Sequence, residues 1–218
     1  MRSRTPIIPS ILTDNPEEFN RRLDFAKKNT QSAQIDLTDG NFCTGSTLKV
    51  EDWPKIDLEY SEAHLMVNDP LKYFQTLKEK NITRAIVHIE SIFDLEVLAN
   101  KARELDLLLG FAVSPDTDLE KLKPFYPVSN CILVMGVVPG SEHQEMLETT
   151  PLAVSFLKKQ PGRLIVSVDG GVNTKTIVEL QKHGANYFVV GSALFGQGDP
   201  ADNYQTLLEK LGDDQQRT

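Results

Sequence analysis

Four polar side chains have the types and spacing of an acid–base or metal site. Gln34 and Asp36 stand two residues apart in the run AQID, so on a strand both point to the same side. His64 lies in the run EAHLM, and Asp169 closes the run LIVSVD. Two carboxylates that face each other can move protons on both faces of a planar substrate, and a histidine beside them can complete a divalent-metal site. These side chains meet only if the fold brings the ends of their apolar runs together.

The apolar runs recur along the whole chain. They begin near residues 7, 33, 61, 84, 107, 131, 164 and 186. Each is closed by a small or polar residue: Ser10, Asp36, His64, His88, Ser114, Gly136, Asp169 and Gly191-Ser192. The spacing fits one strand, one helix and two short loops, and eight such units predict an α/β fold, a single closed (β/α)8 TIM barrel. In such a barrel all eight run ends open onto one face.

Helix signals lie between the apolar runs. A capping residue precedes a proline in three places, Asn15-Pro16, Asp69-Pro70 and Asp199-Pro200. Apolar residues at helical spacing occur at Leu95, Leu98, Ala99 and Ala102, and less regularly at Leu152, Ser155 and Phe156. A doubly wound open sheet is the alternative, but no GxGxxG follows the first run, IIPSIL. We expect one domain over residues 1–218, with a frayed tail at 212–218.

The composition narrows the function classes. The chain has 218 residues, of which 40% are hydrophobic, enough for a sizeable core. The formal net charge of −8 argues against a general nucleic-acid binder, and no apolar run is long enough to cross a membrane. Cys43 and Cys131 are far apart and form no CxxC pair, so we expect a cytoplasmic protein.

Glycine-rich loops follow the seventh and eighth runs. They contain Gly170 and Gly171 in the first loop, and Gly191 and Ser192 in the second. Barrels often bind phosphate on these two loops, because glycine lets an anion approach free backbone N–H groups. The sequence therefore predicts a phosphorylated small molecule as ligand.

Taken together, these segments resemble the ribulose-phosphate 3-epimerase family. The resemblance rests on IIPSIL, IDLTDGNF, AHLM, VHIES, VMGVVPG, SVDGGVN and GSALF, in that order, and covers the chain from Ile8 to about Leu211. It implies a carbohydrate-metabolism isomerase of the pentose phosphate pathway that is a homo-oligomer. It also implies one divalent metal ion, of which Zn, Mn, Fe, Co and Mg are the candidates.

The resemblance implies a role for each matching residue. Asp36 and Asp169 would be the catalytic acid and base as well as metal ligands, and His64 would be a ligand beside the substrate. The other substrate-binding positions would be Ser10, Met66, Met135, Gly140, Gln144, Gly170, Gly171, Gly191 and Ser192.

The chain departs from the family pattern at several of these positions. Gln34 replaces a metal-binding histidine, and its neutral carbonyl would favour a hard ion or leave the site without a metal. Thr38 replaces a methionine, and the lid segment reads Asn41 to Gly45. In the loop after the sixth run, Glu142 would repel a phosphate unless it turns outward, and His143 could compensate or could be a solvated loop residue.

Three functions remain open at this stage. The first is the epimerisation of D-ribulose 5-phosphate and D-xylulose 5-phosphate at C3 through an enediolate. The second is a related barrel enzyme that acts on a different sugar phosphate, as the altered lid and sixth loop suggest. The third is a barrel that binds a phosphorylated ligand without catalysis, as the replaced metal ligand suggests.

Overall fold

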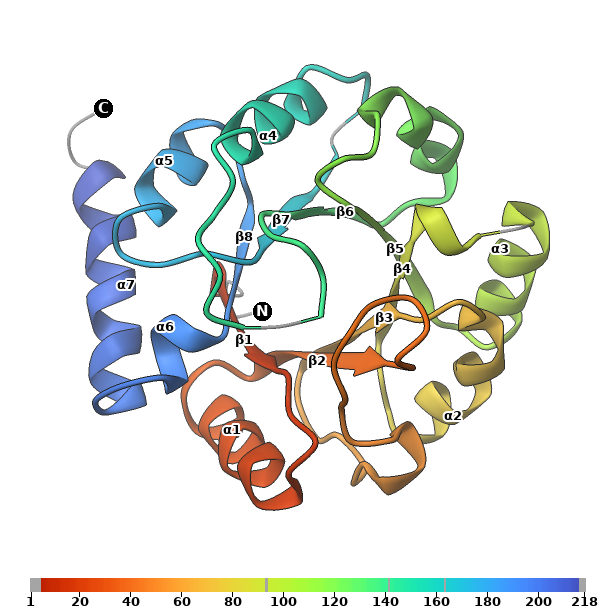
Figure 1. Cartoon of the computed structure of the whole chain (residues 1–218), viewed down its shortest axis with the longest axis horizontal. Coiled ribbons are helices and arrows are strands. Elements are labelled where there is room, and N and C mark those ends of the chain that lie inside the picture. Colours follow the sequence, from red (N-terminus) through yellow and green to blue (C-terminus); the bar gives the residue numbers. More distant parts are fainter. Residues whose placement is uncertain (1–4, 93, 141, 163, 216–218) are drawn as a thin grey trace.

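Eight parallel strands close into a ring in the order of the sequence (Figure 1). This architecture is seen in a computed structural model that describes residues 5–92, 94–140, 142–162 and 164–215. The strands are Ile7–Ile11 (β1), Ser32–Thr38 (β2), Tyr60–Met66 (β3), Arg84–His88 (β4), Leu108–Val113 (β5), Cys131–Met135 (β6), Val166–Asp169 (β7) and Tyr187–Val190 (β8). The predicted (β/α)8 barrel is confirmed, and the open sheet is excluded because β8 pairs with β1.

Helices surround the ring on its outer side (Figure 1). The α-helices are Pro16–Asn29 (α1), Phe74–Glu79 (α2), Leu95–Glu104 (α3), Thr150–Lys158 (α4), Ile177–Lys182 (α5), Ser192–Phe195 (α6) and Pro200–Gln215 (α7). Short 3₁₀ helices add Val50–Asp52 (η1), Pro70–Tyr73 (η2), Ile89–Ser91 (η3) and Leu119–Val128 (η4). Two connections, β2 to β3 and β5 to β6, contain only 3₁₀ helix; the second carries Pro124 and Pro127, which cannot donate to a helical carbonyl.

The predicted helix starts are found, with one difference in helix type. The Asn15 side chain accepts hydrogen bonds from the backbone N–H groups of Glu17 and Glu18, at 2.8 and 3.1 Å, and caps α1. α7 begins at Pro200, whereas Pro70 begins the 3₁₀ helix η2. In α4 the buried face is not the one that the spacing of Leu152 suggested, because Leu152 is 65% exposed.

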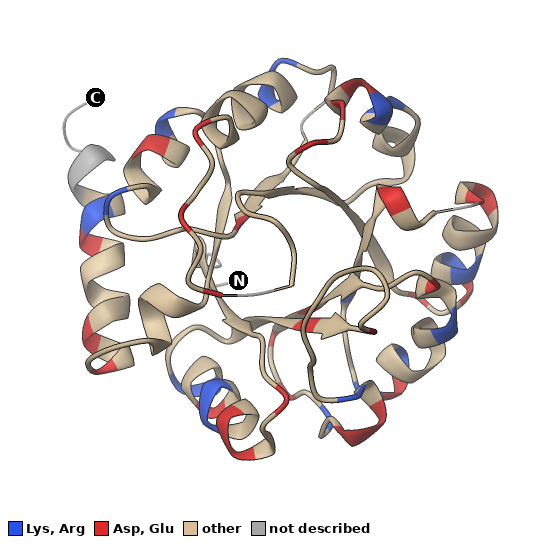
Figure 2. Cartoon of the chain, in the orientation of Figure 1, with Lys and Arg blue, Asp and Glu red and all other residues tan. Residues whose placement is uncertain are grey.

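Two apolar cores hold the barrel together. The larger lies between the strands and the helices and includes Trp53, Phe74 and Phe111. The smaller fills the inside of the ring with Ile8, Ile86, Ala112, Leu133, Met135 and Val189. Most charged residues lie on the outer helices and loops, whereas the ring of strands is largely uncharged (Figure 2). The barrel is therefore a packed scaffold whose function resides at one end.

Strand register determines which polar residues meet. Ser10 pairs with Gln34, Asp36 with His64, and Met135 with Asp169, all near the carboxyl ends of their strands. Deeper in the barrel, the register sets Glu62 against Arg84, and their buried ion pair measures 3.1 Å.

The C-terminal helix continues into the segment that was expected to be frayed. α7 extends to Gln215, so residues 212–215 are helical; residues 216–218 of the predicted frayed tail lie outside the described residues. Within the described part of the chain, no helix has the length and apolar character that crossing a bilayer requires.

Candidate active site

The four polar residues with which the sequence analysis began meet at the carboxyl end of the barrel. Ligand atoms of Asp36, His64 and Asp169 all lie within 4.8 Å of one another. The side-chain amide nitrogen of Gln34 donates to Asp36 Oδ1 at 2.8 Å and to Asp169 Oδ2 at 2.7 Å. Asp36 and His64 are buried, and the Asp169 side chain is 15% exposed. One nitrogen atom thus bridges two carboxylates that come from different sides of the ring.

The Gln34 amide turns its nitrogen toward the carboxylates, whereas a metal ion there would need the amide oxygen. Its nitrogen faces the carboxylates, while its oxygen is buried and has no hydrogen-bond partner. A buried oxygen without a partner is costly, and reversing the amide would turn that oxygen toward Asp36 and Asp169. The two carboxylates and the imidazole Nδ1 are a ligand set that fits a divalent ion, with the Gln34 oxygen as a fourth donor after this reversal.

Asp36 lies in a site that disfavours its charge. Burial and the nearby negative charge of Asp169 raise its pKa, against the hydrogen bonds that His64 and Ser10 supply. Ser10 Oγ donates to Asp36 Oδ2 at 2.7 Å and fixes the carboxylate from the neighbouring strand. A raised pKa suits a carboxyl group to the role of a general acid, which must give up a proton during the reaction.

His64 begins a buried chain of hydrogen bonds that leads away from the carboxylates. Its Nδ1 lies 3.0 Å from Asp36 Oδ1, and its Nε2 lies 2.9 Å from Nε2 of His88. His88 Nδ1 lies 3.2 Å from Glu90 Oε2. The sequence marks His88 only as the end of an apolar run; the pairing of β3 with β4 sets the two rings side by side.

The pKa values of the two histidines shift in opposite directions. Burial opposes the charge of His64, but the hydrogen bonds to Asp169 and Asp36 outweigh it and raise the His64 pKa to about 9. Burial lowers the pKa of His88 to about 4, despite the hydrogen bond to Glu90. A protonated His64 can then donate from Nε2 to Nε2 of a neutral His88, an arrangement that fits the 2.9 Å contact.

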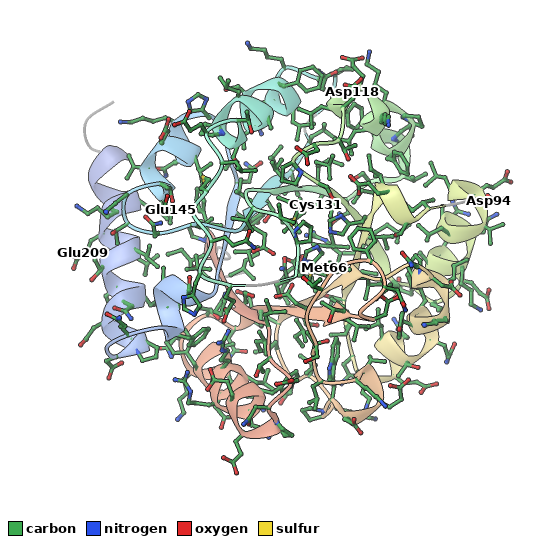
Figure 3. All side chains as sticks on the ribbon, viewed as in Figure 1. Met66, Asp94, Asp118, Cys131, Glu145 and Glu209 are labelled. Carbon is green, nitrogen blue, oxygen red and sulfur yellow. The ribbon has the colours of Figure 1, made fainter. Side chains whose placement is uncertain are left out.

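A cavity opens above the carboxylates. Met66, near the middle of the ring in Figure 3, and Met135 give it an apolar wall. The remaining predicted substrate-binding residues line the same cavity: Ser10, His64, Gly140, Gln144, Gly170, Gly171, Gly191 and Ser192. The structure therefore gathers in one place the residues that the sequence singled out.

The glycines after β7 are required by their surroundings. Gly171 has a φ of +69°, and a β-carbon there would lie 2.6 Å from the backbone nitrogen of Met146. Gly170 has a φ of +98°, and a β-carbon there would overlap the Val137 side chain. These positions let the loop after β7 pass directly against the segment that follows β6.

The predicted lid segment, residues 41–45, also lies against the segment that follows β6. The Phe42 ring is 4.7 Å from the His88 ring between centroids. A β-carbon at Gly140 would overlap the backbone oxygen of Thr44 and lie 3.0 Å from Cys43 Sγ. The loop after β2 and the loop after β6 are therefore in contact over the mouth of the barrel.

Glu142 does not turn outward, the position in which it would avoid repelling a phosphate. Its carboxylate lies against Gly191, where a β-carbon would collide with Oε1, and it pairs with Arg22 at 2.9 and 3.1 Å. His143 is exposed, which agrees with the solvated alternative. Sequence reasoning missed Arg22, although one signal was present: it shares the buried face of α1 with Phe19 and Leu23.

Comparison with known proteins places the chain among sugar-phosphate epimerases. A family model described as the ribulose-phosphate 3 epimerase family matches residues 6–195. Ribulose-phosphate 3-epimerase of Schizosaccharomyces pombe is 33% identical over 143 residues, covering 66% of this chain and 63% of that protein. The enzyme of the same name from Aquifex aeolicus is 30% identical over 171 residues, covering 75% of this chain and 77% of its own.

Solved structures share the fold at lower identity. A mutant tryptophan synthase alpha-subunit from Pyrococcus furiosus superposes with a TM-score of 0.70 at 19% identity, over 95% of this chain and 98% of its own. Orotidine 5'-monophosphate decarboxylase from Sulfolobus solfataricus gives a TM-score of 0.66 at 13% identity, over 96% and 98% of the two chains. At these identities the likeness concerns the barrel alone.

Proposed function

The chain belongs to the ribulose-phosphate 3-epimerase family, and we propose that it interconverts D-ribulose 5-phosphate and D-xylulose 5-phosphate by inverting C3. The observation that carries the proposal is the pair Asp36 and Asp169, whose oxygens both lie within 2.8 Å of one Gln34 nitrogen at the floor of the cavity. An inversion at carbon needs one group to remove a proton and another to return one from the opposite face. Two carboxylates at this separation can flank a single carbon atom.

The proton movements can be assigned to the two carboxylates. Asp169, which is open to the cavity, would remove the C3 proton of D-ribulose 5-phosphate. The electrons of the broken C–H bond would form the C2–C3 double bond, leaving the negative charge of an enediolate on the C2 oxygen. Asp36, whose pKa is raised by burial, would deliver a proton to the other face of C3. In the reverse direction the two residues exchange roles.

The other residues of the cavity would hold the substrate and keep water away. Ser10 fixes Asp36 through the 2.7 Å hydrogen bond, and Met66 and Met135 supply an apolar wall next to the reacting carbon. The glycines after β7 and β8 would receive the phosphate on their backbone N–H groups. A divalent ion held by Asp36, His64 and Asp169, with Gln34 as a further oxygen donor, would supply several kcal/mol of stabilisation to the developing negative charge.

Solvent isotope incorporation tests the proposed reaction directly. The purified chain is incubated in D₂O with D-ribulose 5-phosphate, and the products are followed by proton NMR. We expect D-xylulose 5-phosphate that carries deuterium at C3. Conversion without deuterium at C3, or no conversion at any divalent-metal concentration, would rule out this proton transfer.

A second candidate is a related enzyme that acts on a different sugar phosphate. The position of the Glu142 carboxylate against Gly191 favours it, because this residue narrows the end of the cavity at which the substrate phosphate would lie. A panel of pentose and hexose phosphates, compared by kcat/KM, separates the two. The first proposal requires D-ribulose 5-phosphate to be the best substrate of the panel.

A further inference from the structure

One of the residues that line the cavity, Glu142, forms an ion pair with Arg22. Arg22 Nη1 and Nη2 donate to the two oxygens of Glu142 at 2.9 and 3.1 Å. Arg22 comes from α1 and Glu142 from the loop after β6, and their side chains are 9% and 19% exposed. The carboxylate lies against Gly191, which belongs to the glycine loop after β8. A negative charge of the protein itself thus lies beside the loop that would receive the substrate phosphate.

Residues other than Glu142 also hold the Arg22 guanidinium in place. Its Nε donates to Glu18 at 2.6 Å, and its carbon lies 4.9 Å from the centre of the Phe195 ring. Nη1 also lies 3.4 Å from the Ser10 carbonyl oxygen. These contacts do not depend on Glu142, so the two Nη groups would keep their direction if the carboxylate left. Glu18 would still pair with Nε if Glu142 left, but Nη2 would lose its acceptor and Nη1 would keep only the Ser10 carbonyl oxygen.

The phosphate and the Glu142 carboxylate cannot occupy this end of the cavity together. The Glu142 carboxylate lies so close to Gly191 that a β-carbon there would overlap Oε1, so it occupies the space against the backbone that would receive the phosphate. Two anions a few ångströms apart would also repel each other strongly away from bulk water.

We propose that Glu142 acts as a stand-in anion on Arg22, and that the substrate phosphate displaces it and takes over both Nη donors. The inference rests on the proposed function for the identity of the anion. A phosphate carries more negative charge than a carboxylate and has three acceptor oxygens, so it satisfies the same planar fork at least as well. The exchange conserves the buried ion pair while it enlarges the cavity. Arg22 is then a specificity-determining residue for phosphorylated substrates, and Glu142 a competitor of the substrate.

Binding of inorganic phosphate by isothermal titration calorimetry tests the exchange without turnover. Glu142→Gln keeps the shape of the side chain and removes its charge, so phosphate should bind at least about tenfold more tightly than to the parent chain. Arg22→Gln should weaken phosphate binding at least about tenfold. In the Arg22→Gln background, Glu142→Gln should tighten phosphate binding by less than it does in the parent chain, because only the repulsion between carboxylate and phosphate is then removed. Glu145→Gln is the matched control: Glu145 is an exposed carboxylate on the same loop, and this variant should bind phosphate as the parent does (Figure 3).

Kinetics with D-ribulose 5-phosphate supply the second readout. KM should fall for Glu142→Gln and rise for Arg22→Gln, with smaller changes in kcat, because the exchange concerns the phosphate and not C3. Should Arg22→Gln not fold, Arg22→Lys keeps the charge without the fork and should raise KM.

The outcomes separate the exchange from the proposed reaction. If Glu142→Gln binds phosphate no more tightly than Glu145→Gln does, or if Arg22→Gln and Arg22→Lys both bind it as well as the parent chain, the exchange is refuted. If phosphate binding responds as expected but no variant converts D-ribulose 5-phosphate, the proposed function fails and the exchange stands.

Discussion

Gln34 and Asp169 are 135 positions apart in the sequence, yet the Gln34 amide nitrogen lies 2.7 Å from Asp169 Oδ2. The same nitrogen lies 2.8 Å from Asp36 Oδ1. An N–H₂ group has two hydrogens, and here each points at one carboxylate. Gln34 therefore holds the two carboxylates close together, as a cation would, but its neutral amide does not cancel their charge.

Replacing Gln34 by histidine should increase the affinity for transition metals. Imidazole is a better ligand for zinc than an amide oxygen, and Gln34→His adds it beside Asp36, His64 and Asp169. We expect zinc to bind at least about tenfold more tightly, measured by competition with a chromophoric chelator. Gln197→His, at an exposed loop position, controls for an added surface histidine and should leave the affinity unchanged. Equal affinities for the parent chain and Gln34→His would show that residue 34 does not reach the ion.

Single Asp→Asn changes should separate the two proton transfers. Asp36→Asn and Asp169→Asn each remove one proton-transfer group while keeping the packing, so conversion should fall by about 10²–10⁴-fold. In D₂O, Asp36→Asn should still exchange the C3 proton of D-ribulose 5-phosphate, and Asp169→Asn only that of D-xylulose 5-phosphate.

The control for this pair of variants is Asp24→Asn. Asp24 is an exposed residue of α1 that lies outside the cavity, and its replacement should leave both conversion and exchange unchanged. Exchange of both epimers by both variants would exclude the assignment of one carboxylate to each face of C3.

The metal-free chain should lose stability above neutral pH because of His64. The folded chain raises the His64 pKa from 6.5 to about 9, so between these pH values it holds a proton that the unfolded chain has released. The stabilisation is fully present below pH 6.5 and is lost as the pH rises through about 9. In the presence of a chelator, the free energy of unfolding in urea should fall between pH 6.5 and 9 by up to about 3 kcal/mol more for the parent chain than for His64→Gln. Equal losses in both chains would contradict the shift.

Two glycine replacements with different surroundings should lower the free energy of unfolding by different amounts. Gly40 and Gly171 have φ values of +72° and +69°, but a β-carbon at Gly40 meets nothing within 4 Å, whereas one at Gly171 meets the Met146 backbone at 2.6 Å. Gly40→Ala should lower the free energy of unfolding by about 1–2 kcal/mol, the cost of the left-handed conformation. Gly171→Ala should also force the new β-carbon against the Met146 backbone, so the total loss of unfolding free energy should reach roughly 2–5 kcal/mol. Similar melting temperatures for the two variants would mean that the loop after β7 can move away from Met146.

The fold could be predicted because it follows from local sequence patterns. Alternation of apolar runs and capped helices identified the barrel, and the i, i+2 spacing of Gln34 and Asp36 placed both on one side of β2. The convergence of Asp36, His64 and Asp169 followed from the barrel rule that strand ends share a face.

The orientation of side chains at the site could not be predicted in the same way. Which end of the Gln34 amide faces the carboxylates depends on neighbours that come from two other strands. The inward position of Glu142 depends on Arg22, 120 residues earlier in the chain, and no local pattern links an α1 arginine to the loop after β6. A charge on an otherwise apolar helix face was the one available hint.

The closure of the ring by β1 and β8 has a consequence for how the chain is made. Ile7, near the start, needs Phe188 as its neighbour, and the Phe188 N–H donates to the Pro6 oxygen at 2.8 Å. During synthesis the first strand must therefore wait, with one edge unpaired, until residues 187–190 have left the ribosome. For this barrel, the slow and aggregation-sensitive interval of folding is the delay before its last strand arrives.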